Sequence, residues 1–212
     1  MALRQELTAA IAALYARGYA LGTGGNFSAV ADREPLRLWM APSGVDKGTV
    51  TAEDLILVDE DGHSTMGKVS AEASLHRAIA LATGAGAVLH THSVLGTVLS
   101  MAHGSAGYIR LQGYEMLKGL AGITTHTAAV DLPIWPNSQD MEGLAARVTP
   151  HLATAPWGFL LAGHGLYAWG RNVFEARRHV EVLEFLLAVR YHAQGYPSPS
   201  AEVTATGREA DG

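Results

Sequence analysis

The chain has 212 residues, of which 48% are hydrophobic and 17% charged, a balance typical of a single globular domain with a buried core. Its formal net charge of −5 argues against the basic surface that nucleic acid requires, so we expect no nucleic-acid partner. The sequence contains no cysteine, which excludes disulfides, thiolate metal sites and a cysteine nucleophile. A transition metal would therefore need imidazole and carboxylate ligands.

The first predicted elements are one helix and three short strands. Apolar residues recur at helical spacing between Leu3 and Tyr15, and Gly18 is a plausible stop. Charged residues interrupt this segment, so it is predicted to be neither a signal peptide nor a membrane span. We accordingly expect no membrane partner and a cytoplasmic location. Strands are predicted over residues 27–31, 36–41 and 55–58.

The middle of the chain alternates between helix and strand. Ser70 is predicted to cap a helix that carries Glu72 in its first turn and ends at Gly84. The following segments are predicted to be strands at 87–92, 108–111 and 130–134, and helices at 94–101 and after Asp140.

The last elements are a hairpin and a long helix. The hairpin is predicted over 159–169 and turns at Gly163-His164-Gly165, and the helix covers 173–192. The tail, 197–212, is rich in small and polar residues and is predicted to be disordered. Because no repeat or linker divides the chain, we expect one α/β domain over 1–196, with helices packed on a central mixed, mainly antiparallel sheet.

The sharpest chemical signal is His90-Thr91-His92. Alternate residues of a strand share a face, so the two imidazoles would point to one place while Thr91 points away. The apolar residues before His90 predict a partly buried strand, in which ring nitrogens need partners. Two exposed strand histidines without a function are an equally weighted alternative for this pair alone.

His164 favours the metal-binding interpretation. It lies between two glycines that allow a tight turn and a close approach to another element. Three neutral imidazoles leave a divalent ion one open coordination position, as in catalytic zinc sites. A turn histidine held by backbone hydrogen bonds is the alternative for His164 taken by itself. Zinc suits three imidazoles, although manganese, cobalt and iron(II) also bind such sites.

Two carboxylates have both a structural and a catalytic interpretation. Glu72 either complements the dipole of its helix or reaches the metal, and its spacing does not separate the two. Glu115 follows a strand and begins a short helix, where an acid is unremarkable. If Glu115 faced the metal, it would be suited to general acid/base catalysis.

A set of turns and caps offers backbone N–H groups and hydroxyls of the kind that bind phosphate. Each is a weak signal alone, because structural turns use the same residues. Neither a dinucleotide-binding fingerprint nor a Walker motif is present. The set comprises Gly25 and Asn26 in a glycine-rich loop, the turn Ser43-Gly44, the cap Ser70, and Lys47 as a nearby charge.

In combination these motifs resemble the class II aldolase family, which includes sugar-phosphate aldolases and 4-epimerases. The resemblance covers about residues 3 to 192 and implies a three-layer αβα fold. The shared motifs, which occur in the family order, are Gly25-Asn26-Phe27-Ser28, Pro42-Ser43-Gly44, Ser70-Ala71-Glu72, His90-Thr91-His92 and Gly163-His164-Gly165.

Two further strings, around Glu115 and from Gly163 to Gly170, resemble the methylthioribulose-1-phosphate dehydratase branch of methionine salvage. This resemblance implies one zinc ion per subunit on His90, His92 and His164, and Glu115 as the acid/base. It also implies a small phosphorylated ketose substrate, a homo-oligomer that is usually a tetramer, and active sites near subunit boundaries. The loops around Asn26, Ser43-Gly44 and Ser70-Ala71 would hold the phosphate, and Glu72 is a secondary site residue.

Two alternatives remain open at this stage. An aldolase or epimerase would use Glu72 as its base and would not need Glu115. A non-catalytic protein would keep the fold and the metal as a scaffold for a partner.

Overall fold

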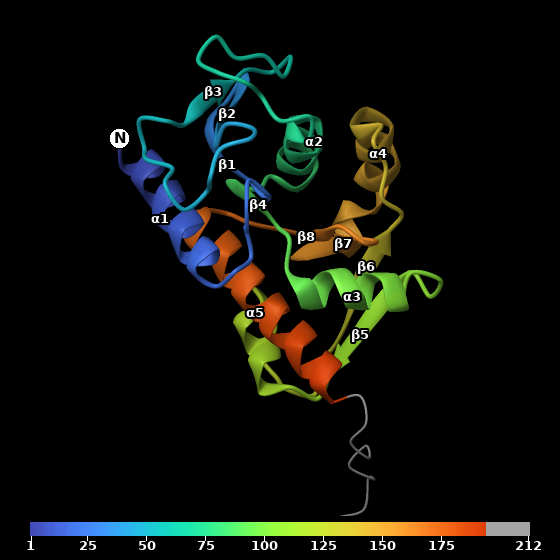
Figure 1. Cartoon of the computed structure of the whole chain (residues 1–212). Helices are drawn as coiled ribbons and strands as arrows, with labels where there is room; N and C mark the ends of the chain where they lie inside the picture. Colours follow the sequence, from blue (N-terminus) through green and yellow to red (C-terminus); the bar gives the residue numbers. More distant parts are fainter. Residues whose placement is uncertain (194–212) are drawn as a thin grey trace, which may run out of the picture.

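The computed structural model describes residues 1–193, which form one eight-stranded sheet with helices on both faces (Figure 1). The strand order is β3-β2-β1-β4-β8-β7-β6-β5, and neighbouring strands are antiparallel except for the parallel pair β6–β7. The predicted α/β architecture with a mixed, mainly antiparallel sheet is confirmed.

The elements follow the predicted order with small changes at their ends. The strands are β1 (Asn26–Arg33), β2 (Leu36–Met40), β3 (Ile56–Val58), β4 (Ala87–Thr91), β5 (Tyr108–Gln112), β6 (Ala129–Trp135), β7 (Gly158–Leu161) and β8 (Gly165–Gly170). The helices are α1 (Ala2–Ala16), α2 (Ala73–Thr83), α3 (Val94–Ala102), α4 (Met141–Val148) and α5 (Val173–His192), with 3₁₀ turns η1 (Glu115–Gly119) and η2 (Thr149–Thr154).

Alternation along the strands divides the core into two sides and produces the three layers. Leu89 of β4 packs in the cluster that contains the buried faces of α1, α3 and α5. Val88, the preceding residue, packs on the opposite side with α2 and α4. Each fully buried aliphatic side chain of this kind contributes about 1.5–3 kcal/mol to folding. Both faces of the sheet are thus covered, which fixes its central strands.

The start of α2 differs from the prediction. The helix begins at Ala73, so Glu72 is the N-cap residue and not a first-turn residue, and Ser70 is not the cap. The reason is a turn that precedes the helix, in which the backbone N–H of Ala73 donates to the carbonyl of Ser70 at 3.1 Å. The hydroxyl of Ser70 accepts from the backbone N–H of Glu72 at 3.2 Å. The Glu72 side chain is therefore free to turn toward the sheet.

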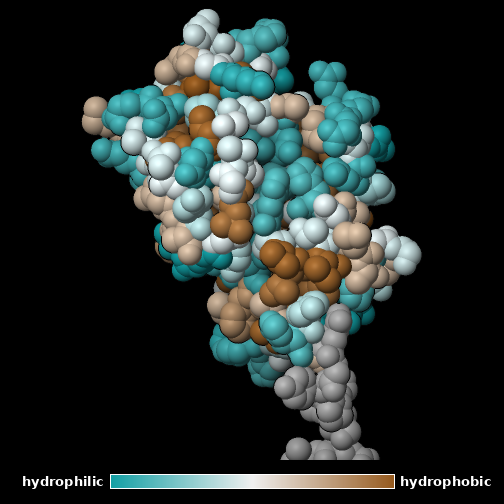
Figure 2. Space-filling view, viewed as in Figure 1, coloured by the Kyte–Doolittle hydropathy of each residue, from teal (hydrophilic) through white to brown (hydrophobic). Residues whose placement is uncertain are grey.

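The surface of α3 carries an apolar patch, which is the brown area in Figure 2. We call it the α3 patch, and it consists of Val94, Val98 and Met101, whose exposed fractions are 71%, 41% and 68%. Their spacing places them on one face of the helix. Among residues 1–193, no helix is both long enough and apolar enough to cross a membrane. The predicted disordered tail, 197–212, lies outside the described residues.

Candidate metal centre

His90 and His92 converge at the end of β4. Their Nε2 atoms are 2.8 Å apart, while Thr91 points to the other face and donates from its hydroxyl to Glu184 at 3.1 Å. His90 is completely buried and His92 is half-buried. The backbone N–H of His92 donates to the carbonyl of Tyr19 at 2.8 Å, which holds the strand end in place. The alternation expected from the H-x-H spacing thus brings both rings to one point.

His164 completes a cluster of three imidazoles from the β7–β8 turn. Its Nε2 lies 3.3 Å from Nε2 of His90, and one nitrogen of each ring falls within 4.8 Å of the others. Gly163 has a φ of +67°, a conformation that favours glycine. A Cβ on Gly165 would lie 2.0 Å from the carbonyl oxygen of Thr91, so only glycine allows this approach to β4. The glycines on both sides of His164 are therefore required by geometry.

The hydrogen bonds of the outer ring nitrogens fit a metal site. Nδ1 of His90 donates to the carbonyl of Leu166 at 3.0 Å, which leaves the lone pair of Nε2 free to bind an ion. Nδ1 of His164 lies 3.3 Å from the amide oxygen of Asn137. Burial lowers the pKa of His90 well below its ordinary value, and burial also lowers the pKa of His92. Both rings are thus neutral near pH 7, which is the state that binds a metal.

Glu72 lies beside the three imidazoles. One of its oxygens, Oε2, is 3.4 Å from Nε2 of His90, and Oε1 is 3.5 Å from Nε2 of His164. The amide of Asn26 donates to Oε2 at 2.8 Å, and the phenol of Tyr167 donates to the same oxygen. Asn26, a predicted phosphate ligand, therefore contacts Glu72 in this chain. The carboxylate is close enough to act as a metal ligand or as a base.

Three of the predicted phosphate-binding residues, Ser43, Ser70 and Ala71, line one open cavity of about 700 Å³. A backbone hydrogen bond joins the Ser43-Gly44 turn to the segment before Ser70: the N–H of Ser43 donates to the carbonyl of Lys68 at 3.0 Å. The same cavity is lined by polar residues that were not predicted from the sequence, among them Asp61, His63, Asp140 and Glu142. Three more lie before the helix α2 and on its first turns. They are Lys68, Ser74 and Arg77.

Lys47, Gly25 and Gly44 do not line that cavity. They support the glycine-rich loop and the Ser43-Gly44 turn. Lys47 is only 1% exposed, and its ammonium donates to the carbonyls of Thr23 and Val45, each at 3.1 Å. It thereby joins the glycine-rich loop to the Ser43-Gly44 turn. Gly25 and Gly44 have φ values of +80° and +75°, so both turns need glycine at these positions.

Glu115 is placed away from the three histidines within one chain. It begins η1, whose Leu117 packs in the core on the α5 side of the sheet, whereas His90 and Glu72 lie on the α2 side. Its side chain is 71% exposed, forms an ion pair with Lys118 at 2.6 Å and approaches His126 at 3.8 Å. The hydrogen bond from Lys118 lowers the pKa of Glu115. A single chain therefore does not assemble the whole predicted site.

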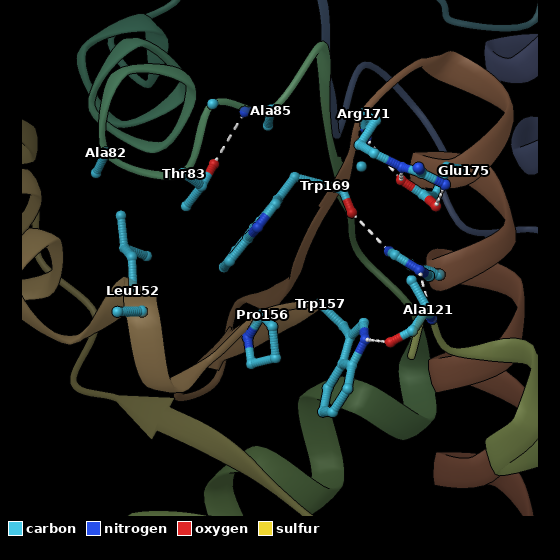
Figure 3. Close-up of a pocket in the computed structure, with 14 residues that line it drawn as sticks. Ala82, Thr83, Ala85, Ala121, Leu152, Pro156, Trp157, Trp169, Arg171 and Glu175 are labelled. Carbon is cyan, nitrogen blue, oxygen red and sulfur yellow. Dashed lines mark hydrogen bonds and ion pairs between the residues drawn. The ribbon is translucent and has the colours of Figure 1, made fainter. Parts of the chain in front are cut away.

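A second cavity, of about 400 Å³, lies at the far end of β8 from His164 (Figure 3). Trp169 and Leu152 contribute apolar walls, and the indole N–H of Trp157 donates to the carbonyl of Ala121 at 2.8 Å. None of the predicted site residues lines it.

Comparison with known proteins shows the family of the chain. Residues 5–191 match the model of the family described as class II aldolase and adducin N-terminal domain. The chain belongs to the class II aldolase and adducin family. A methylthioribulose-1-phosphate dehydratase from Xanthomonas campestris is 45% identical over 189 residues, which cover 87% of this chain and 86% of the relative.

A second relative and one solved structure extend the comparison. A methylthioribulose-1-phosphate dehydratase from Serratia proteamaculans is 47% identical over 194 residues, with coverage of 88% of this chain and 94% of the relative. The crystal structure of YgbL from Klebsiella pneumoniae superposes with a TM-score of 0.78 at 28% identity, and covers 92% of this chain and 91% of that one. The predicted family and its three-layer fold are thus confirmed.

Proposed function

We propose that this protein is a zinc-dependent dehydratase of methionine salvage. It converts 5-methylthioribulose 1-phosphate to 5-methylthio-2,3-diketopentyl 1-phosphate and water, with one zinc ion per subunit. The observation that carries the proposal is the convergence of His90, His92 and His164 beside Glu72. The names of the relatives at 45% and 47% identity support the choice of substrate.

The substrate has a ketone at C2 and hydroxyls at C3 and C4, and its reaction removes the C3 proton and the C4 hydroxyl. A zinc ion on the three imidazoles would supply Lewis-acid polarisation of the C2 carbonyl, which makes the C3 proton more acidic. The cavity lined by Ser43 and Ser70 offers hydroxyls for the phosphate, and Lys68 and Arg77 offer positive charge.

The two carboxylates divide the proton transfers. Glu72, fixed by Asn26 and Tyr167, receives the C3 proton. The electron pair of the C3–H bond forms a C3–C4 double bond as the C4–O bond breaks. Glu115 gives a proton to the departing hydroxyl, which leaves as water. The enol that remains becomes the C3 ketone when its O–H proton passes to solvent and C4 takes up a proton from solvent. Exchange with solvent returns each carboxylate to its starting state.

Glu115 acts on the site of a neighbouring subunit in this proposal. Its exposed position on η1 keeps it from the histidines of its own chain, so a homo-oligomer, which we propose to be a tetramer, brings the two together. Burial against the neighbour would also raise the pKa of its carboxyl toward the range that a general acid needs. Each active site is then incomplete without a partner.

Purified, metal-replete protein tests the reaction directly. Methylthioribulose 1-phosphate should give the diketone phosphate, detected by its ultraviolet absorbance, and no product from zinc-loaded oligomer would refute the proposal. The Glu115→Gln variant should keep its zinc and lose most of its turnover, because the amide cannot donate the proton.

Mixed oligomers test the shared site. Glu115→Gln and His92→Ala are each expected to be inactive alone, but hybrids combine intact histidines with an intact Glu115. Random one-to-one reassembly should restore about one quarter of the sites if each uses residues from two chains. No recovery in hybrids that mass spectrometry confirms would place both groups in the same subunit.

A sugar-phosphate aldolase or 4-epimerase is the second candidate, and the closeness of Glu72 to His90 and His164 favours it. Such an enzyme would break the C3–C4 bond or invert C4 with Glu72 as its base. Full turnover of an aldol substrate by Glu115→Gln would select this function. If zinc raised the melting temperature but phosphate and substrate did not, the protein would instead be a non-catalytic scaffold.

A further inference from the structure

Tyr167 contacts both His90, one of the candidate metal ligands, and Glu72, and no role was predicted for it from the sequence. It lies directly opposite His90 in the β4–β8 pair and is completely buried. Its ring stacks on the ring of His90, with centroids 4.0 Å apart and planes inclined by 15°. Phe159 stacks on its other side at 5.2 Å. Packing on both faces holds the phenol in one orientation.

The phenol O–H is directed at a single oxygen of Glu72. Oε2 accepts from Tyr167 and from the amide of Asn26, whereas no hydrogen bond to Oε1 is present among residues 1–193. Oε1 is therefore the oxygen that remains available beside Nε2 of His164. The two donors come from different strands, β8 and β1, so the carboxylate is held from two directions.

We propose that Tyr167 is a positioning residue that, with Asn26, fixes Glu72 beside the metal and leaves Oε1, the oxygen without a hydrogen bond in the described part of the chain, free to meet the ion or the substrate. The inference rests on the proposed metal site and on Glu72 as its working carboxylate. Because the hydroxyl of Tyr167 acts through Glu72, its removal should have no effect once Glu72 can no longer carry charge. A hydroxyl that served only to fill buried space would not depend on Glu72.

Zinc affinity, measured by competition with a chromophoric chelator, tests the proposal without any substrate. Tyr167→Phe keeps the stacked ring and removes one hydroxyl, so the carboxylate charge is no longer held near the ion. We expect the zinc dissociation constant to rise about tenfold, within the range seen when an outer-shell partner is removed. In a Glu72→Gln background the same substitution should change that constant less than twofold.

Two further variants separate this role from general loss of structure. Ser28→Ala also removes a buried hydroxyl from the same side of the sheet, where it contacts His76 at 2.7 Å, and it should leave zinc affinity unchanged. Asn26→Ala removes the other donor to Oε2 and should weaken zinc binding in the same Glu72-dependent way. If Tyr167→Phe does not fold, the Asn26 variant alone still tests whether the donors to Oε2 affect zinc affinity through Glu72.

The visible absorption of cobalt-substituted protein gives a second measurement. The spectrum should change in Tyr167→Phe and should not change further when that substitution is added to Glu72→Gln. An equal loss of zinc affinity in both backgrounds, or an equal loss in Ser28→Ala, would overturn the assignment. Since neither measurement uses a sugar phosphate, failure of the dehydratase assay and failure of this inference are distinguishable.

Discussion

In the candidate metal centre, the orientation of His90 depends on what its second nitrogen and its ring contact. The bond from Nδ1 of His90 to Leu166 sets the tautomer, and the packing of Tyr167 sets the ring plane. His92 has less support, because its ring is only half-buried and is placed mainly by the backbone bond to Tyr19. The ligand set is thus rigid at His90 and relies on strand geometry at His92.

Removing His92 should therefore remove the ion without unfolding the chain. His92→Ala leaves two imidazoles, which rarely hold a divalent ion tightly, so bound zinc should fall below about one tenth of an equivalent. Turnover should fall in parallel. Elemental analysis beside the activity assay provides the measurement, with the exposed His151→Ala as the matched control. A full equivalent of zinc in an active His92→Ala protein would show that the site lies elsewhere.

The convergence of the three histidines was predictable at the residue scale, and the groups that support them were not. Strand alternation alone places His90 and His92 on one face, and the glycines beside His164 indicate a close approach. In the sequence, Tyr167 is one more residue of an apolar predicted strand. Its role could not be predicted, because it depends on the register between β4 and β8. Lys47 reads as an available surface charge, and only the packed loops show that it is buried.

At the element scale, α5 supports β4, the strand of His90, from the opposite face. Glu184 on this helix is 2% exposed and accepts the hydroxyl hydrogen of Thr91, which lies between the two histidines. Its burial raises the pKa of the carboxyl from its ordinary 4.5 to about 7, and hydrogen bonds from Ser93 and Thr91 oppose the shift. The helix thus carries an acid whose ionisation is costly in the folded state.

Because ionisation of Glu184 is costly in the folded state, the free energy of unfolding depends on pH. Because the folded-state pKa of Glu184 is raised, the folded chain binds its proton more tightly, and stability falls as pH rises from about 4.5 to about 7. Glu184→Gln removes this ionisation. At pH 8 the variant should be more stable than wild type, by on the order of 3 kcal/mol, while at pH 4 the difference should nearly vanish.

Urea unfolding of metal-free protein, at one fixed protein concentration and at each pH, measures the stability difference between Glu184→Gln and wild type. The control is Glu181→Gln on the same helix, whose carboxylate is partly exposed and pairs with Arg177 at 2.8 Å. It should give no comparable rise in stability at pH 8. A pH-independent difference between Glu184→Gln and wild type would show that packing, and not ionisation, sets the effect.

The elements themselves were largely predictable, because apolar periodicity and glycine stops mark most of their ends. Two features could not be predicted from the sequence and are seen only in the folded structure. The turn before α2 moved Glu72 to the N-cap, where its side chain faces the histidines. The junction between a strand and a short helix at Glu115 was predicted correctly. Which side of the sheet η1 covers could not be predicted, because it depends on how the whole chain packs.

At the scale of the whole molecule, the α3 patch lies next to the three histidines. The helix α3 begins at Val94, two residues after His92, so anything that covers this patch also borders the metal centre. A second apolar surface lies near Glu115, where Met116 and Phe185 are 39% and 47% exposed. Burial of such surfaces between subunits is consistent with the proposed homo-oligomer and brings a neighbour close to the histidines.

A charge in the α3 patch should therefore separate subunits and stop catalysis together. Met101→Lys places an ammonium on an exposed helix face, so the chain should still fold, but burying that charge between subunits would be costly. We expect a smaller species by light scattering, turnover at least tenfold lower, and zinc content per chain unchanged. Leu81→Lys is the matched control, because Leu81 is 65% exposed on α2 and outside both apolar surfaces. A Met101→Lys protein that dissociates yet keeps full turnover would show that one chain contains a complete site, and Glu115 would then lose its proposed role across the interface.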